Sequence, residues 1–243
     1  MPPPPHHTLA LITIGQSPRH DYTPDLPFLL PARTTLAQHG ALDALSLAVV
    51  RATLAPRPGD PVLVSRMRDG TQVTLSAPLL APLLGACVRR VARSGAADAI
   101  VLLCTGEDAV PEGVGVPVVM PQEAVRRWLE ESGRGRGVVV VSPEERQVGP
   151  ARGRWKGVGG CRVVAGRAAT PYGEGSAEEV RQCAEWIRGV VEAEGMEVLV
   201  YLDCMGYTLE HKRMVEEVVG GKVEVVVPRE VVFKAAGKVL GEE

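Results

Sequence analysis

The sequence alternates short, wholly apolar runs with longer amphipathic segments. The apolar runs cover residues 9–14 (LALITI), 99–103 (AIVLL), 137–141 (GVVVV) and 198–202 (VLVYL). A strand that is covered on both faces of its sheet is apolar along its whole length, as these runs are. Strands that alternate with helices form β-α-β units, which build parallel sheets. The sequence therefore predicts an α/β fold with largely parallel sheets.

Helical periodicity and capping signals place the remaining elements. Ser176 is the expected N-cap of one long helix, and Gly95 and Gly133 are expected to end two others. The expected helices cover residues 78–94, 122–131, 147–155, 176–194, 209–219 and 231–239. Further strands are expected at residues 61–64, 116–119, 162–165 and 223–227.

Each half of the chain contains an apolar strand that ends in a cysteine. Cys104 follows the strand at 99–103 and Cys204 the strand at 198–202, and glycine and hydroxyl residues come next in both halves. The two cysteines are separated by about half of the ordered chain, as a pseudo-twofold pair of lobes requires. The expected organisation is a disordered arm at residues 1–8, a first lobe from 9–115 and 221–243, and a second lobe from 116–220.

Composition excludes several classes of partner. The net charge is −2 with acids and bases interspersed, so a basic field for nucleic acid is absent. Aromatic residues make up 4% of the chain, too few for a base-stacking surface. No apolar run approaches the length of a membrane span, and residues 1–7 lack the features of a secretion signal. We therefore expect a cytoplasmic protein that binds neither nucleic acid nor membrane.

The cysteine pattern indicates free thiols and no metal. There are five cysteines, none in a C-x-x-C pair and none near a second cysteine or histidine at zinc spacing. A reducing compartment is the simplest explanation of this pattern. The sequence also contains no Walker, G-x-S-x-G or H-E-x-x-H motif. No cofactor is expected.

Cys104 and Cys204 are the candidate catalytic residues. A single cysteine at a strand end is usually a packing residue, but two in matching contexts suit one kind of chemistry. Inversion of a carbon beside a carboxylate needs a base on one face and an acid on the other. A thiol, with an ordinary pKa near 8.5, can act as either. Cys87, Cys161 and Cys183 lack this context and are assigned to packing.

Polar residues after the strands are candidates for binding a small anion at the carboxyl ends of the sheet. Arginine suits carboxylate capture, although a solvated surface loop explains Arg19 and Arg66 equally well and is favoured for Arg68. Asp203 is a candidate either to orient a neighbouring residue or to cap a helix, and a cap is the favoured expectation. His211 is expected to be exposed unless it approaches the site. The substrate-binding candidates are Gln16, Ser17, Arg19, Arg66, Thr105, Gly106, Gly206, Tyr207 and Thr208.

Several of these segments resemble the AroM family. They are LALITIGQSPRHD, LVSRMRDG, VLLCTGE, the VVVVSPEERQ…W run and VYLDCMGYTLEHKR, and the resemblance covers residues 9 to 240 in order. Residues 22–58 match least well, so nothing is carried over there. AroM proteins are similar to the aspartate/glutamate and hydantoin racemases, maleate isomerase and arylmalonate decarboxylase. The resemblance implies two Rossmann-like lobes with a substrate cleft between them, flanked by Cys104 and Cys204.

The chain departs from the racemase pattern beside both cysteines. Thr105-Gly106 stands where Asn-Thr is typical, Met205 where threonine is usual, and Gln16-Ser17 where glutamate racemases have Asp-Ser. These departures leave the substrate open. The resemblance implies a cofactor-independent racemase, epimerase or isomerase that acts on a small carboxylate or hydantoin-like compound. Alternatives are a single-thiol decarboxylase or isomerase and a non-catalytic metabolite-binding protein, and a homodimer is compatible with any of them.

Overall fold

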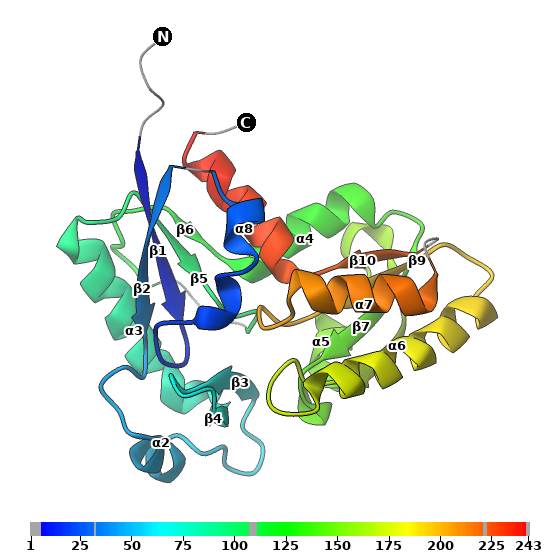
Figure 1. The fold of residues 1–243 in the computed structure, drawn as a ribbon, viewed down its shortest axis with the longest axis horizontal. Coiled ribbons are helices and arrows are strands. Elements are labelled where there is room, and N and C mark those ends of the chain that lie inside the picture. Colours follow the sequence, from blue (N-terminus) through cyan, green and yellow to red (C-terminus); the bar gives the residue numbers. More distant parts are fainter. Residues whose placement is uncertain (1–5, 32, 107–110, 221–222, 242–243) are drawn as a thin grey trace. The chain divides into compact units, whose positions relative to one another are not determined.

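The protein is an α/β structure with parallel sheets (Figure 1). The computed structural model describes residues 6–31, 33–106, 111–220 and 223–241. The chain divides into two units, which are described separately. Unit 1 comprises residues 1–121 and 232–243, and unit 2 comprises residues 122–231.

Unit 1 is built on a four-stranded parallel sheet with the strand order β2-β1-β5-β6. Its apolar core includes Ile12 from β1, Cys87 from α3 and Ile100 from β5. The strands are β1 (His7–Thr13), β2 (Thr34–Gly40), β5 (Ala99–Leu102) and β6 (Val118–Val119). The helical elements are η1 (His20–Tyr22), α1 (Leu26–Leu29), α2 (Leu47–Thr53) and α3 (Ala77–Ser94).

Unit 2 is built on a second four-stranded parallel sheet with the order β10-β9-β7-β8. The central strands β7 and β9 are buried along their whole length, as their apolar sequences predict. The strands are β7 (Gly137–Ser142), β8 (Arg162–Ala168), β9 (Val198–Leu202) and β10 (Glu224–Val226). The helical elements are α4 (Pro121–Ser132), α5 (Glu145–Trp155), η2 (Val158–Gly160), α6 (Ser176–Ala193) and α7 (Leu209–Val219). The last helix, α8 (Pro228–Val239), begins in unit 2 and belongs to unit 1 from Val232 onward.

The two sheets have the same topology. When the strands of each sheet are counted in chain order, both sheets run second, first, third, fourth from one edge to the other. Cys104 and Cys204 each follow the third strand of their own sheet, β5 and β9. The two cysteines are therefore topologically equivalent, as their matching sequence contexts predict.

A small antiparallel hairpin lies outside both parallel sheets. It pairs β3 (Val62–Arg66) with β4 (Gln72–Ser76). The sequence predicts a strand at 61–64 but no return strand. Residues 22–58, for which no element was expected, contain β2, an edge strand that is mostly half-buried and so has no continuous apolar run.

Helix ends follow local chemistry, with one correction. Gly95 ends α3 in the left-handed conformation, with φ of 64°, as predicted. Ser176 is not an N-cap as expected, because it is the first residue of α6 and Gly175 precedes it with φ of 86°. A residue with positive φ suits glycine, so the helix begins one residue earlier than the serine signal indicates.

The bounds of the two units differ from those expected for the lobes. β6 pairs with β5 and so belongs to the sheet of unit 1, whereas residues 116–220 were expected to form the second lobe. β10 pairs with β9 in unit 2, whereas residues 221–243 were assigned to the first lobe. Residues 1–5 of the expected disordered arm lie outside the described residues, and His7 and Thr8 belong to β1.

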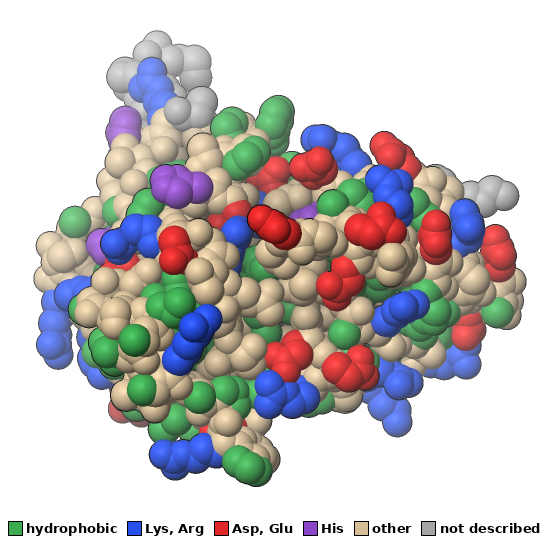
Figure 2. Space-filling model, turned by 60° about the horizontal axis from the view of Figure 1, so that its bottom comes forward, with side chains coloured by type: hydrophobic (Ala, Val, Ile, Leu, Met, Phe, Trp, Pro, Cys, Tyr) green, Lys and Arg blue, Asp and Glu red, His purple; other side chains and the backbone are tan. Residues whose placement is uncertain are grey.

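The surface carries mixed charges. Figure 2 shows acidic and basic side chains interspersed over the face drawn, in keeping with the net charge of −2. Within the described ranges, no helix is long and apolar enough to span a membrane.

Candidate active site

Cys104 lies at the carboxyl edge of the sheet of unit 1. Its side chain is partly buried and packs against the core of this unit. The backbone N–H of Gly106 donates a hydrogen bond to Cys104 Sγ, with N···S at 3.2 Å. Since β1 and β5 are parallel neighbours, the loops after these two strands leave the sheet at the same edge. Cys104 therefore shares this edge with Gln16 and Ser17.

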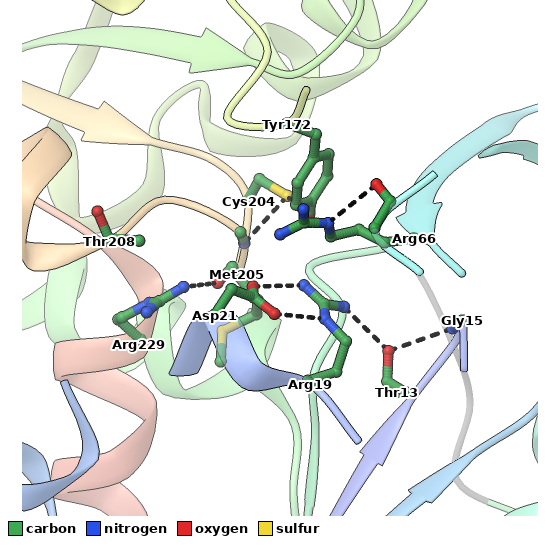
Figure 3. A network of polar contacts seen from close by, with 12 residues as sticks. Thr13, Gly15, Arg19, Asp21, Arg66, Tyr172, Cys204, Met205, Thr208 and Arg229 are labelled. Carbon is green, nitrogen blue, oxygen red and sulfur yellow. Dashed lines mark hydrogen bonds and ion pairs between the residues drawn. The ribbon is translucent and has the colours of Figure 1, made fainter. Parts of the chain in front are cut away.

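Cys204 occupies the equivalent place in unit 2 and is 8% exposed. The N–H of Gly206 donates to Cys204 Sγ at 3.3 Å (Figure 3). The hydroxyl of Tyr172, in the loop after β8, lies 3.5 Å from the same sulfur. Tyr172 was not among the residues expected at the site.

The two thiols thus share one local geometry, in which the glycine two residues later points its N–H at the sulfur. In each unit the sulfur is the acceptor of a backbone N–H group. Gly106 and Gly206 were expected to offer their N–H groups to a bound anion. In the structure these groups face the cysteine sulfurs instead.

The other three thiols are packing residues, as expected. Cys87, Cys161 and Cys183 are buried, and burial raises the pKa of all three thiols, that of Cys183 to about 12. All five cysteines lie in the described part of the chain and are free.

Asp203, immediately before Cys204, holds the end of β9 in place. It is 4% exposed, and its Oδ2 accepts hydrogen bonds from Arg154 Nη1 and Trp155 Nε1, both at 3.1 Å. The expectation that Asp203 caps a helix is wrong, because the N-cap of α7 is Thr208. Both partners come from the C-terminal end of α5, so Asp203 fastens this helix to the loop of Cys204.

Arg229, which is fully buried, also holds the loop of Cys204 in place. Its Nη2 donates to the carbonyl oxygen of Met205 at 2.9 Å (Figure 3). Arg229 stands second in α8, which begins at Pro228. Sequence reasoning did not identify it.

Tyr207 and Thr208 hydrogen-bond within unit 2. The Tyr207 side chain is fully buried and its hydroxyl donates to the carbonyl oxygen of Ala169. Burial also raises the pKa of Tyr207 well above its ordinary value. Thr208 caps α7 by accepting the His211 N–H at 3.1 Å, and His211 Nδ1 accepts the Thr208 N–H at 3.2 Å. His211 is therefore the second half of a capping box.

In unit 1, Arg19 is 3% exposed and forms an internal ion pair. Its Nε and Nη2 donate to the two carboxylate oxygens of Asp21 at 2.8 and 2.7 Å, and its Nη1 donates to Thr13 Oγ1 at 3.1 Å (Figure 3). The bidentate geometry expected for a substrate carboxylate is thus occupied by a carboxylate of the protein.

Asp43, which follows β2, organises the loop after β1. Its carboxylate accepts hydrogen bonds from Ser17 N at 2.7 Å, Ser17 Oγ at 2.8 Å and Gly40 N at 2.8 Å. Because a carboxylate accepts but does not donate, the hydroxyl proton of Ser17 points at Asp43, and this hydroxyl can only accept from a ligand. Asp43 lies in the segment from which nothing was carried over, so it was missed.

Gln16 and Arg68 connect the hairpin of β3 and β4 to the loop after β1. Gln16 donates to the carbonyl oxygens of Leu42 and Leu45 at 3.2 and 2.8 Å and accepts the Arg68 N–H at 2.9 Å. The Arg68 side chain is 53% exposed, yet its Nε donates to the Ser17 carbonyl oxygen. Arg66 Nε lies 3.5 Å from the Gly70 carbonyl oxygen, and Thr105, beside Cys104, is 9% exposed.

Comparison with known proteins identifies a family whose model matches this sequence. The family model of the AroM protein matches residues 9–240. No protein of curated function matches the sequence. Among the described residues, no group of three or more His, Cys, Asp or Glu side chains is arranged to hold a metal ion.

Solved structures with the same fold share little sequence with this chain. Allantoin racemase from Klebsiella pneumoniae is 18% identical, with a TM-score of 0.58 over 97% of this chain and 89% of that one. A glutamate racemase from Bacillus anthracis is 12% identical, with a TM-score of 0.59 over 97% and 82%. An unliganded arylmalonate decarboxylase is 14% identical, with a TM-score of 0.60 over 98% and 94%. At these identities the likeness establishes the racemase-type fold.

Proposed function

Because the chain belongs to the AroM family and has the fold of racemases and a decarboxylase, we propose that it is a cofactor-independent racemase, epimerase or isomerase that uses Cys104 and Cys204. Its proposed substrate is a small carboxylate or a hydantoin-like carbonyl compound. One observation carries the proposal. Two topologically equivalent thiols each receive the N–H of the glycine two residues further along.

The proposed reaction needs the two thiols in opposite protonation states. One cysteine, as a thiolate, removes the proton from the carbon next to the carboxylate or carbonyl group, and the electron pair of the broken C–H bond moves into that group. The other cysteine, as a thiol, then donates its proton to the opposite face of the carbon. The number of protons is unchanged, and the two thiols have exchanged states. The reverse reaction therefore starts from the product enzyme form.

Substrate contacts are proposed from residues at the carboxyl edges of the two sheets. Gln16, Ser17, Tyr207 and Thr208 have hydrogen bonds within their own units, so in this proposal they shape the site and fix its loops. Ser17 presents an acceptor, which suits an N–H group such as the amine of an amino acid or the ring amide of a hydantoin.

The test is a solvent-deuterium exchange screen with chiral α-amino acids, α-hydroxy acids and hydantoins. The wild-type protein should incorporate deuterium at the chiral carbon of at least one compound. Cys104→Ser and Cys204→Ser should each lower turnover by about 10²- to 10⁴-fold, because a hydroxyl is a much poorer base at neutral pH. Cys87→Ala, which alters a buried packing thiol on α3, is the matched control and should keep wild-type turnover.

The outcomes separate the alternatives. If activity survives Cys104→Ser and is lost in Cys204→Ser, the enzyme uses a single thiol, as the additional Tyr172 contact at Cys204 would favour. If these compounds raise the melting temperature while neither cysteine affects any exchange, the protein binds metabolites without catalysis. Either result would reject the two-thiol reaction.

A further inference from the structure

We propose that Tyr172 is a positioning residue whose hydroxyl donates a hydrogen bond to Cys204 and holds that cysteine as a thiolate. This inference rests on the proposed reactive role of Cys204, and it is tested without a substrate. Tyr172 lies in the loop after β8, which is the second strand of the sheet in chain order.

Two possible donors lie close to the sulfur of Cys204. The Tyr172 hydroxyl oxygen is 3.5 Å from Cys204 Sγ, and the Gly206 nitrogen is 3.3 Å from it. With a neutral thiol, either the thiol or the phenol can be the donor. Once the thiol has lost its proton, only the phenol can donate. The thiolate would then receive two hydrogen bonds, one from Tyr172 and one from Gly206.

The two donors are packed tightly against one another. A Cβ atom at Gly206 would lie 2.2 Å from the Tyr172 hydroxyl oxygen and 2.4 Å from the ring carbon that carries it. Only glycine allows the phenol to approach this closely. Tyr172 is itself 4% exposed, and its backbone N–H donates to Thr170 Oγ1 at 3.3 Å. The phenol is therefore held in place over the loop of Cys204.

Other ionisable groups lie around this loop. Burial raises the pKa of Cys183 to about 12 and raises the pKa values of Tyr201 and Tyr207 well above the ordinary tyrosine value, so all three are neutral near pH 7. The Asp203 carboxylate, whose charge would oppose a neighbouring thiolate, is paired with Arg154 at 3.1 Å. These groups therefore add little net charge opposing a thiolate at Cys204.

The experiment is site-resolved alkylation of the intact protein. Wild-type protein and Tyr172→Phe are treated with iodoacetamide over a range of pH, and the labelling rate of each cysteine is followed by mass spectrometry of the peptides. Phenylalanine keeps the ring and removes only the hydroxyl. Tyr22→Phe, which alters a buried tyrosine of unit 1, is the matched control.

We expect the labelling rate to change only at Cys204 and only near neutral pH. In Tyr172→Phe, Cys204 should be labelled roughly three- to tenfold more slowly near pH 7. This decrease is smaller than the loss of a short charge-assisted hydrogen bond would cause, because the O···S distance of 3.5 Å is long. The midpoint of its rate-against-pH curve should move upward. At high pH, where the thiol is ionised in both proteins, the rates should converge. Tyr22→Phe should match the wild-type protein.

Two results would overturn the inference. An unchanged Cys204 curve would mean that the phenol does not stabilise the thiolate. A rate lowered by the same factor at every pH would mean that Tyr172 affects only access to the sulfur. Neither result bears on the proposed reaction, which the exchange screen tests separately with Cys204→Ser. Should Tyr172→Phe fold poorly, Tyr172→3-fluorotyrosine keeps the shape with a stronger donor, and it should move the curve of Cys204 downward.

Discussion

Asp203 and Arg19, which both follow strands, are almost completely buried, and both are paired. Asp203 contacts Arg154 and Trp155, while Arg19 contacts Asp21. Placing a charge in the interior is costly unless hydrogen bonds compensate for the lost water. These groups therefore fix the loops after the strands. Removing one partner of a pair should lower the free energy of unfolding by more than the buried area of that side chain alone would predict.

Trp155→Phe tests this at the residue scale. The substitution keeps an aromatic side chain in the core but removes the indole N–H that binds the buried Asp203 carboxylate. We expect the free energy of unfolding to fall by about 1–3 kcal/mol, measured by urea denaturation. Trp186→Phe, which alters a half-buried tryptophan stacked on Arg167, should cost less. Equal losses in the two variants would mean that ring volume, and not the bond to Asp203, is responsible.

Residues of the site were predicted only where the local sequence carries the signal. The cysteines and the glycines after them were identified because they follow apolar strands directly. Tyr172 and Arg154 reach the loop of Cys204 from 32 and 49 residues away from their partners, Cys204 and Asp203. Such pairings depend on the order of strands in the sheet, which a single sequence does not reveal.

At the scale of elements, the structure confirms the strands that are apolar throughout. Strands β1, β5, β7 and β9 lie where the apolar runs predict them. β2 was not predicted because it is an edge strand of mixed composition. β4, the return strand of the hairpin with β3, was not predicted either. Complete burial thus makes a strand readable from sequence, whereas partial burial does not.

Helix α5 contains two exposed glycines that weaken it without a visible purpose. At both Gly149 and Gly153 a Cβ atom would meet nothing within 4 Å. Gly149→Ala and Gly153→Ala should therefore each raise the free energy of unfolding by about 0.5–1 kcal/mol, since alanine loses less backbone entropy in a helix. Thermal or urea denaturation measures the gain. A loss of stability in either variant would contradict the open surroundings of these positions.

Gly206→Ala should have the opposite effect. Its Cβ atom would overlap the ring and hydroxyl of Tyr172, which must then move. We expect a loss of about 1–3 kcal/mol in the free energy of unfolding, as for other overpacked sites. The same denaturation curves measure it beside Gly149→Ala, and a neutral result would mean that Tyr172 moves without cost.

At the scale of the whole molecule, buried thiols and phenols make stability dependent on pH in alkaline solution. Burial raises the pKa values of Cys87, Cys161, Cys183, Tyr201 and Tyr207. Above the ordinary pKa of each group the unfolded chain loses the proton while the folded chain keeps it, so the folded state becomes less favourable as pH rises. Their contribution is fully present below the ordinary thiol pKa.

The prediction is a falling free energy of unfolding from about pH 9 upward, by about 1.4 kcal/mol per pH unit for each group that has ionised only in the unfolded chain. For Cys183 the window runs from the ordinary thiol pKa to about 12. Urea denaturation at a series of pH values measures the slope. Cys183→Ala should make it shallower, and a slope unchanged in that variant would show that other groups set it.

The two cysteines belong to different units, and the proposed reaction needs both of them. Cys104→Ser combined with Cys204→Ser should then lower turnover by little more than either change alone, because a pair that has lost one member has already lost the reaction. The rate should also depend on pH as a bell whose limbs belong to the coupled pair. Additive losses in the double variant would mean that the thiols act independently.

The path of the chain sets an order of events at the ribosome. Unit 1 is discontinuous: it opens the sequence, and its last segment, residues 232–243, comes after all of unit 2. Phe233 from that segment packs edge-on against Tyr22, with ring centroids 6.2 Å apart. Synthesis proceeds at about 5–20 residues per second, so the first unit to emerge must wait for residues 232–243 before its packing is complete. The later unit, contiguous in sequence, is the one that can close first.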